Sequence, residues 1–144
     1  MKEYKIYRLF SSPIFNFRPE NYNELNTELE EYILDLKKKY KNGQIKSNRG
    51  GWHSPFFDLS KDSPAKKFLL VAQKFTREVI VNEMGWKYNA DKVKISPMWS
   101  IINKKGSFNI QHNHPNAYLS AAYYVRYPKN SGNIKFYDPK EQKN

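Results

Sequence analysis

The sequence contains no cysteine among its 144 residues. Disulfide bonds, thiolate metal sites and cysteine nucleophiles are therefore excluded. No apolar run approaches the roughly 20 residues that a membrane-spanning helix needs. The first residues, Met1–Lys5, lack the apolar core of a signal peptide. We therefore expect a cytoplasmic protein that makes no membrane contact.

The chain is short of acidic residues, with 14 Asp and Glu against 25 Lys and Arg. The resulting net charge of +11 leaves anionic partners open, including nucleic acid. However, the lysines are spread along the chain, so we interpret the charge mainly as a solvated surface. The aromatic content of 16% is too high for a disordered chain. Length and composition together predict a single domain over residues 1–144.

Two segments have the spacing of amphipathic helices. The first begins near Asn21 and ends at Asn42-Gly43, with acids early and lysines late, as the helix dipole favours. The second begins at Ser63-Pro64, a serine cap followed by proline at the first helical position, and ends at Gly85. We interpret both as packing elements. The apolar stripes are Tyr22, Leu25, Leu29, Tyr32 or Ile33, and Leu36 in the first, and Phe68, Leu69, Ala72, Phe75, Val79 and Ile80 in the second.

The remaining regular structure is predicted to be β. Ile6–Phe10 reads as a short strand stopped by Ser11-Ser12-Pro13. After Asp91 the segments 93–103, 108–114, 119–127 and 133–137 carry partial or clear apolar alternation between turn residues. Helices followed by antiparallel strands indicate an α+β layout, with the helices bracing a sheet or barrel.

Two of the three histidines, His112 and His114, stand one residue apart between Gly106 and Pro115. In a strand they would point to the same face, and two neutral imidazoles on one face can hold a divalent transition metal. The alternative is a pair of exposed polar residues on a loop. The third histidine, His53, lies in a glycine-rich aromatic segment, residues 47–59, that could cover a pocket. His53 is a candidate third ligand, although a lone loop histidine is more often a surface or packing residue.

An ordered set of motifs extends from Trp99 to Pro139 and resembles the 2-oxoglutarate/Fe(II)-dependent oxygenase family of phages and marine bacteria. Residues 47–59 also look like the first half of that family. The motifs are Trp99-Ser100-Ile101-Ile102-Asn103, Gly106, Asn109, His112-Asn113-His114-Pro115, Leu119-Ser120, Tyr123-Tyr124-Val125, Pro128, Gly132 and Phe136-Tyr137-Asp138-Pro139.

The resemblance implies a double-stranded β-helix, a jelly-roll or cupin-like barrel with Fe(II) in its mouth, behind two N-terminal helices. It implies Fe(II) and 2-oxoglutarate as cofactors and hydroxylation of an unactivated C–H bond as the reaction. By similarity, His112 matches the first metal ligand and His114 the position of the family's acidic ligand. Tyr124 matches a tyrosine near the 2-oxoglutarate carboxylate. Asn103, with Asn109, would donate hydrogen bonds around the site, unless these asparagines serve packing or turns.

The sequence departs from the family pattern in two ways. At His114, histidine replaces the acidic ligand of the family. This replacement leaves the bound metal one charge more positive, so the pattern no longer specifies which metal binds. The family also places a distal histidine and a 2-oxoglutarate-binding arginine on later strands. No histidine follows His114, and the last arginine, Arg126, is on the wrong strand for that role. We therefore expect a domain incomplete at its C-terminus, inactive alone or completed by a partner chain or a second copy over the open sheet edge.

Two other functions stay open. A cupin-like metal-binding protein without 2-oxoglutarate chemistry would fit the spacing from Gly106 to the histidines. The glutamate that this motif wants four or five residues later is replaced by Tyr118 and Leu119. A basic nucleic-acid-binding protein would use aromatic stacking and phosphate contacts, but no defined motif supports it. The sequence does not indicate the substrate.

Overall fold

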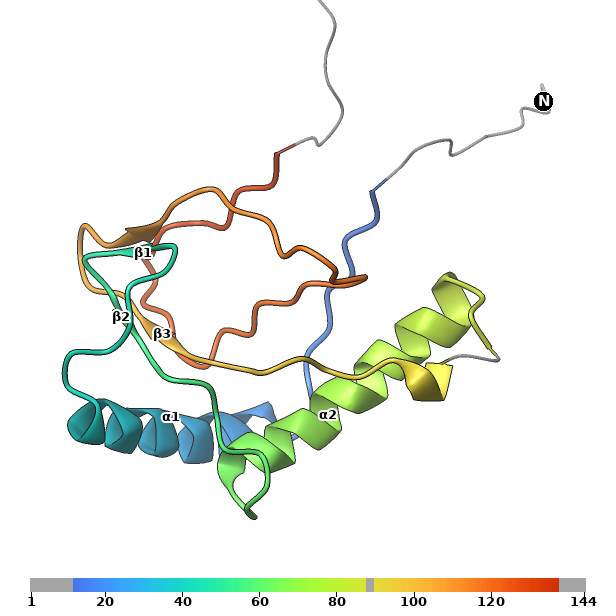
Figure 1. The fold of residues 1–144 in the computed structure, drawn as a ribbon, viewed down its shortest axis with the longest axis horizontal. Helices are drawn as coiled ribbons and strands as arrows, with labels where there is room; N and C mark the ends of the chain where they lie inside the picture. Colours follow the sequence, from blue (N-terminus) through green and yellow to red (C-terminus); the bar gives the residue numbers. More distant parts are fainter. Residues whose placement is uncertain (1–11, 88–89, 138–144) are drawn as a thin grey trace, which may run out of the picture.

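The computed structural model describes residues 12–87 and 90–137. Their regular structure consists of two α-helices, a π-helical segment, a 3₁₀ turn and two short antiparallel strand pairs (Figure 1). The predicted strand Ile6–Phe10 and the chain end from Asp138 lie outside the described residues. None of the helices in these ranges is long and apolar enough to cross a bilayer. The architecture is mixed α+β, as the order of elements in the sequence predicted.

Helix α1 spans Tyr22–Lys39 and buries Leu25, Leu29 and Ile33 along one face. These positions follow the i, i+4, i+8 spacing of the apolar stripe, so the predicted helix and its buried face are confirmed. Lys37, Lys38 and Lys39 occupy the last turn, where the helix dipole favours positive charge.

Helix α2 spans Pro64–Glu78 and begins as its sequence predicted. The Ser63 hydroxyl accepts a hydrogen bond from the Lys66 amide at 3.2 Å, and Pro64 takes the first helical position. A π-helical segment, η1 (Val79–Glu83), extends the helix and buries Ile80. Gly85 then ends it with φ +69°. A 3₁₀ turn, η2 (Ala90–Lys92), follows.

The two helices pack against each other and form the base of the molecule in Figure 1. Leu29 of α1 and Leu69 of α2 are both buried. An ion pair joins Lys67 Nζ to Glu28 Oε2 at 2.7 Å across the two helices. Phe17, in the irregular chain before α1, stacks on Phe75 with ring centroids 4.1 Å apart. The apolar core therefore lies mainly between the helices and the chain above them.

Four two-residue strands pair antiparallel above the helices. Strand β1 (Asn48–Arg49) pairs with β4 (Phe108–Asn109), and β2 (Trp52–His53) pairs with β3 (Ile101–Ile102). Additional backbone bonds extend the pairing: Ser54 N donates to Ser100 O at 2.9 Å, and Ile110 N donates to Ser47 O at 2.9 Å. Residues 47–57 and 98–110 thus form one irregular two-stranded ribbon. The predicted pocket-covering loop at residues 47–59 is instead one side of this ribbon.

The ribbon is interrupted between its two strand pairs. Gly50 and Gly51 separate β1 from β2, whereas residues 103–107 separate β3 from β4. The longer side is a turn in which Ser107 N donates to Lys104 O at 2.9 Å and Gly106 has φ +82°. On the shorter side, a Cβ on Gly51 would lie 2.2 Å from Asn103 Oδ1. Only glycine lets the turn approach the opposite strand this closely.

The strands predicted beyond β4 do not form among the described residues. The histidine strand predicted at 108–114 ends at Asn109, and residues 119–127 and 133–137 form no strand. The backbone bonds of 111–137 to described residues are two local turns, at Ala117 and Ser131, and a strand needs a paired neighbour to satisfy its backbone groups. The double-stranded β-helix is therefore not formed by the described residues.

Candidate functional site

His112 and His114 lie side by side just after β4. Their ring centroids are 5.1 Å apart with 47° between the ring planes, and both side chains are exposed. A turn follows them, in which Ala117 N donates to His114 O at 3.2 Å and Asn116 has φ +64°. The predicted proximity of the two imidazoles is confirmed, although an irregular segment rather than a strand produces it.

The backbone selects the tautomer of His112. Its Nδ1 lies 2.8 Å from the Ile110 carbonyl oxygen. A carbonyl can only accept, so Nδ1 carries the hydrogen and donates it. The lone pair of Nε2 is then free for a metal ion, an arrangement that metal-binding histidines commonly use.

His53 is also close to this pair, through a tryptophan. The His53 ring stacks on Trp99 with centroids 5.7 Å apart and 12° between planes, and His114 stacks on Trp99 at 5.7 Å and 8°. His53 itself is 3% exposed, and its Nδ1 donates to the Ser54 carbonyl at 2.6 Å. His53 is therefore a packing residue in the ribbon. Trp99 links it to His114, which in turn contacts His112. Sequence reasoning quoted Trp99 for the resemblance but missed this role.

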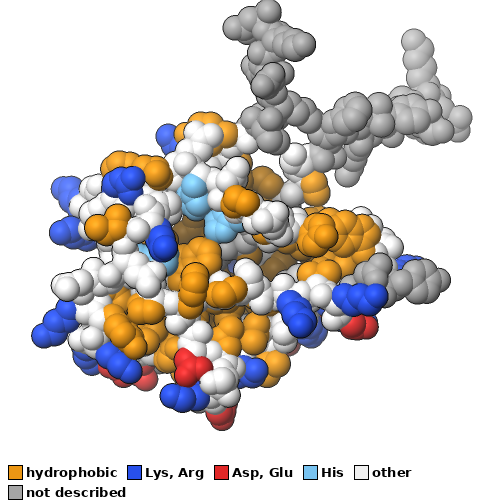
Figure 2. Space-filling view, in the orientation of Figure 1, with side chains coloured by type: hydrophobic (Ala, Val, Ile, Leu, Met, Phe, Trp, Pro, Cys, Tyr) orange, Lys and Arg blue, Asp and Glu red, His pale blue; other side chains and the backbone are white. Residues whose placement is uncertain are grey.

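The three histidines do not form one three-ligand group. Among residues 12–87 and 90–137, no cluster of three His, Cys, Asp or Glu side chains could hold a metal ion. A 2-His-1-carboxylate type of site needs a carboxylate beside its two histidines. No Asp or Glu occurs between Asp91 and Asp138, so the sequence around the pair offers no carboxylate of its own. Figure 2 shows histidine side chains reaching the surface among hydrophobic ones.

The two residues predicted to bind the cofactor, Asn103 and Tyr124, contact different parts of the structure. Asn103 is exposed in the turn between β3 and β4, with its side chain against Gly51. Tyr124 is 51% exposed and meets Tyr127 edge-on at 6.2 Å between centroids. Within the described ranges, no hydrogen bond or ring contact joins either residue to His112 or His114. Their predicted cofactor roles stay predictions.

The segment that carries Tyr124 is held against the helices by its neighbours. The Tyr123 hydroxyl donates to Asn26 Oδ1 of α1 at 2.6 Å, and the Tyr123 ring lies 4.7 Å from that of Phe68 on α2. Arg126 forms an ion pair with Glu30 of α1. Tyr123 and Arg126, which make these contacts, belong to the segment 119–127 that the sequence predicted to be a strand.

Replacing Tyr123 with phenylalanine should lower the free energy of unfolding by about 1 kcal/mol, because the half-buried Asn26 oxygen loses its donor. Burial raises the pKa of Tyr123 above its ordinary value of 10.0. Its stabilisation is therefore fully present below that value and is lost as the pH rises through the raised folded-state pKa. Urea unfolding at neutral and alkaline pH measures both effects. Tyr127→Phe, at a 62% exposed position, is the control and should change neither.

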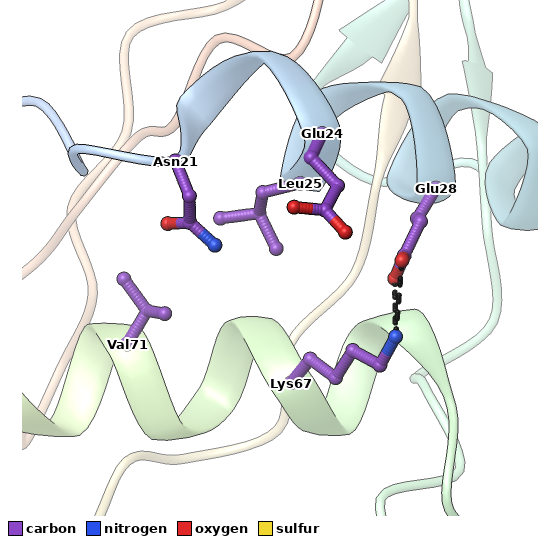
Figure 3. A pocket seen from close by; sticks show the side chains of 6 residues that line it. All are labelled: Asn21, Glu24, Leu25, Glu28, Lys67 and Val71. Carbon is purple, nitrogen blue, oxygen red and sulfur yellow. Dashed lines mark hydrogen bonds and ion pairs between the residues drawn. The ribbon is translucent and has the colours of Figure 1, made fainter.

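Two cavities of the described structure lie away from the histidines. One of about 250 Å³ opens between α1 and α2, and Figure 3 shows the Glu28–Lys67 ion pair at its edge. A second, of about 230 Å³, lies beside η1 and η2. The first is lined by Asn21, Glu24, Leu25, Glu28, Lys67 and Val71. Neither cavity is lined by histidine, so the histidine pair is an exposed site.

Comparison with protein families matches residues 97–144 to the family described as "Putative 2OG-Fe(II) oxygenase". The matched range is the C-terminal third of the chain and contains Trp99, Asn103, His112, His114 and Tyr124. The resemblance found in the sequence is thus confirmed over these residues, while the predicted likeness of residues 47–59 lies outside the matched range. No curated protein and no solved structure matches the chain.

Proposed function

We propose, from the match of residues 97–144 to the 2OG-Fe(II) oxygenase family, that this chain carries two metal ligands of such an oxygenase, His112 and His114. The observation that supports this most directly is the adjacency of the two rings, at 5.1 Å, together with the fixed tautomer of His112. This tautomer presents Nε2 of His112 to a metal ion, and the adjacency places a second imidazole beside it.

The contribution of the chain's own residues can be stated atom by atom. The Ile110 carbonyl holds the Nδ1 hydrogen of His112 and orients its ring. His114 supplies a neutral donor where the family pattern has an acidic one, so the pair neutralises none of the charge of Fe(II). In this family, Fe(II) with 2-oxoglutarate supplies the oxidising power for hydroxylation. Among the described residues no third ligand accompanies the pair, and we assign no reaction step to this chain.

The double-stranded β-helix is part of the same proposal. Residues 119–127 and 133–137 have the alternation of strands, yet several of their apolar side chains, such as Tyr127, Ile134 and Phe136, are at least half exposed. Pairing these segments with further strands would satisfy their backbone groups and bury those side chains. A second copy of this chain, or another polypeptide, would then cover the sheet edge.

Replacing His112 or His114 with alanine should weaken metal binding at least about 10-fold, because each variant removes one of two adjacent donors. Calorimetric titration with Co(II), a stand-in for Fe(II), or anaerobic titration with Fe(II) measures the affinity. Asn113→Ala is the matched control, since Asn113 lies exposed between the two histidines and should bind as the parent does. Equal affinity in all four proteins would refute the proposed ligands.

Turnover requires a separate assay. Under anaerobic iron loading followed by oxygen, 2-oxoglutarate decarboxylation is followed as succinate. Succinate above the level of His112→Ala would show that the chain is an oxygenase by itself. Metal binding without succinate would instead leave a metal-binding member of the family that does not turn over alone.

A further inference from the structure

Trp99 is the link between the exposed histidine pair and the buried part of the ribbon. Its ring is nearly parallel to that of His53 and to that of His114, with centroids 5.7 Å away in each case. The two partners differ sharply in environment: His53 is buried, whereas His114 is exposed. Because the Trp99 ring contacts both histidines, the fixed position of His53 can restrict the position of His114 through it.

We propose that Trp99 is a positioning residue that sets the orientation of His114. This rests on the proposed function, in which His114 is a metal ligand. Among the described residues, the His114 side chain makes no hydrogen bond, unlike those of His112 and His53. Its ring contacts are Trp99 and His112. The face of the Trp99 indole is therefore the rigid surface against which the His114 imidazole packs.

Trp99 is itself held by the ribbon. The next residue, Ser100, accepts a hydrogen bond from Ser54 N at 2.9 Å, and its own amide donates to Ser54 Oγ at 2.9 Å. Ser54 is fully buried. Phe56 also contacts the Trp99 ring, with centroids 6.0 Å apart. On the other side of Trp99, Phe57 N donates to the Met98 carbonyl at 2.8 Å. The backbone on either side of Trp99 is thus bonded to the opposite strand, so the indole has a defined position.

The stack also explains why an exposed histidine would need such support. An imidazole free to change rotamer loses conformational freedom when a metal fixes it, and this cost lowers the affinity. A ring already resting on Trp99 has lost part of that freedom beforehand. The gain depends on a flat aromatic surface, which phenylalanine offers and leucine does not.

The first test uses the metal-free chain. In Trp99→Leu, the ring protons of His114 should move toward the NMR shifts of an unconstrained histidine, because the neighbouring indole ring current is gone. Assignment is made by comparison with His114→Ala. Trp86→Phe is the control, since the Trp86 ring meets the Tyr118 ring edge-on and, among the described residues, contacts no histidine ring. His114 shifts that are unchanged in Trp99→Leu would overturn the proposal, whether or not the chain binds metal.

The second test measures metal affinity. Co(II) should bind Trp99→Leu about 10-fold more weakly than the parent, as expected when a residue that orients a ligand is lost, and Trp99→Phe should bind within about threefold of the parent. Equal affinity of the leucine variant and the parent contradicts the positioning role. If the parent binds no Co(II), the proposed function fails, and the metal-free NMR comparison still decides the contact.

A third measurement covers the case in which Trp99→Leu does not fold. Co(II) bound beside the indole should quench Trp99 fluorescence in the unaltered chain. The quenching should fall sharply in Trp99→Phe, leaving at most the contribution of Trp52 in β2, and should persist in Trp86→Phe. Quenching as strong in Trp99→Phe as in the unaltered chain would mean that the metal binds away from Trp99 and would overturn the proposal.

Discussion

Gly43→Ala should destabilise the chain by about 2–5 kcal/mol. Gly43 has φ +61°, a left-handed conformation that costs an L-residue about 1–2 kcal/mol. A Cβ there would also lie 2.6 Å from Trp52 Cδ1 and 2.8 Å from the His53 carbonyl oxygen. Relieving such overpacking typically costs about 1–3 kcal/mol more. Urea unfolding followed by circular dichroism measures the loss.

Two other glycines separate the causes of this effect. Gly85 has φ +69° with nothing within 4 Å of an added Cβ, so Gly85→Ala should show the conformational cost alone. Gly132 has neither a positive φ nor a close neighbour, and Gly132→Ala should be nearly neutral. If Gly43→Ala destabilises the chain no more than Gly85→Ala does, the Trp52 side chain and the His53 carbonyl must move away from the new Cβ without loss of stability.

The expected damage extends to the site, because Gly43 lies where α1 is joined to the ribbon. Trp52 Nε1 donates to the Tyr40 carbonyl at 2.8 Å, and Gln44 N donates to His53 O at 2.8 Å. Displacing Trp52 or His53 would disturb β2 and the His53 ring against which Trp99 packs. Weaker Co(II) binding by a still-folded Gly43→Ala chain would show this coupling.

Leu29→Ala should cost about 2–5 kcal/mol, the range for a buried leucine that leaves a cavity. Leu29 is 2% exposed in the middle of α1. Leu34→Ala, in the same helix at a 43% exposed position, is the matched control. Alanine favours helices at both positions, so the difference between the variants reports burial alone. Similar losses in both would mean that Leu29 is not in the core, contrary to the helix packing described above.

The helices could be predicted from the sequence because their determinants are local. The spacing of Leu25, Leu29 and Ile33 identifies the buried face of α1, and Ser63-Pro64 identifies the first turn of α2. Strands depend on a partner that the local pattern does not name. Residues 119–127 alternate well yet pair with nothing described, whereas residues 47–57 show little alternation and form one side of the ribbon.

The same distinction between local and long-range information applies to the candidate site. The spacing of His112 and His114, with the turn at Pro115-Asn116, is local information, and their proximity followed from it. The contact of His53 and His114 with Trp99 depends on the register that places His53 opposite Ile101, which no local pattern reveals. The motif around Trp99 marked a position of interest, and only the paired ribbon shows what that position contacts.

The absence of acidic residues between Asp91 and Asp138 has an electrostatic consequence for the whole molecule. Acidic side chains of the described residues belong to the turn before α1, the helices, the loop between them and η2, whereas the charged side chains of residues 92–137 are lysine and arginine only. Figure 2 accordingly shows acidic side chains at the lower and right-hand margins of that view, away from the histidines. Among the described residues, the excess of positive over negative charge is therefore larger over residues 92–137 than over the helices and the loop between them. An approaching dianion is drawn toward the histidine end, faster at low ionic strength, before any specific contact forms.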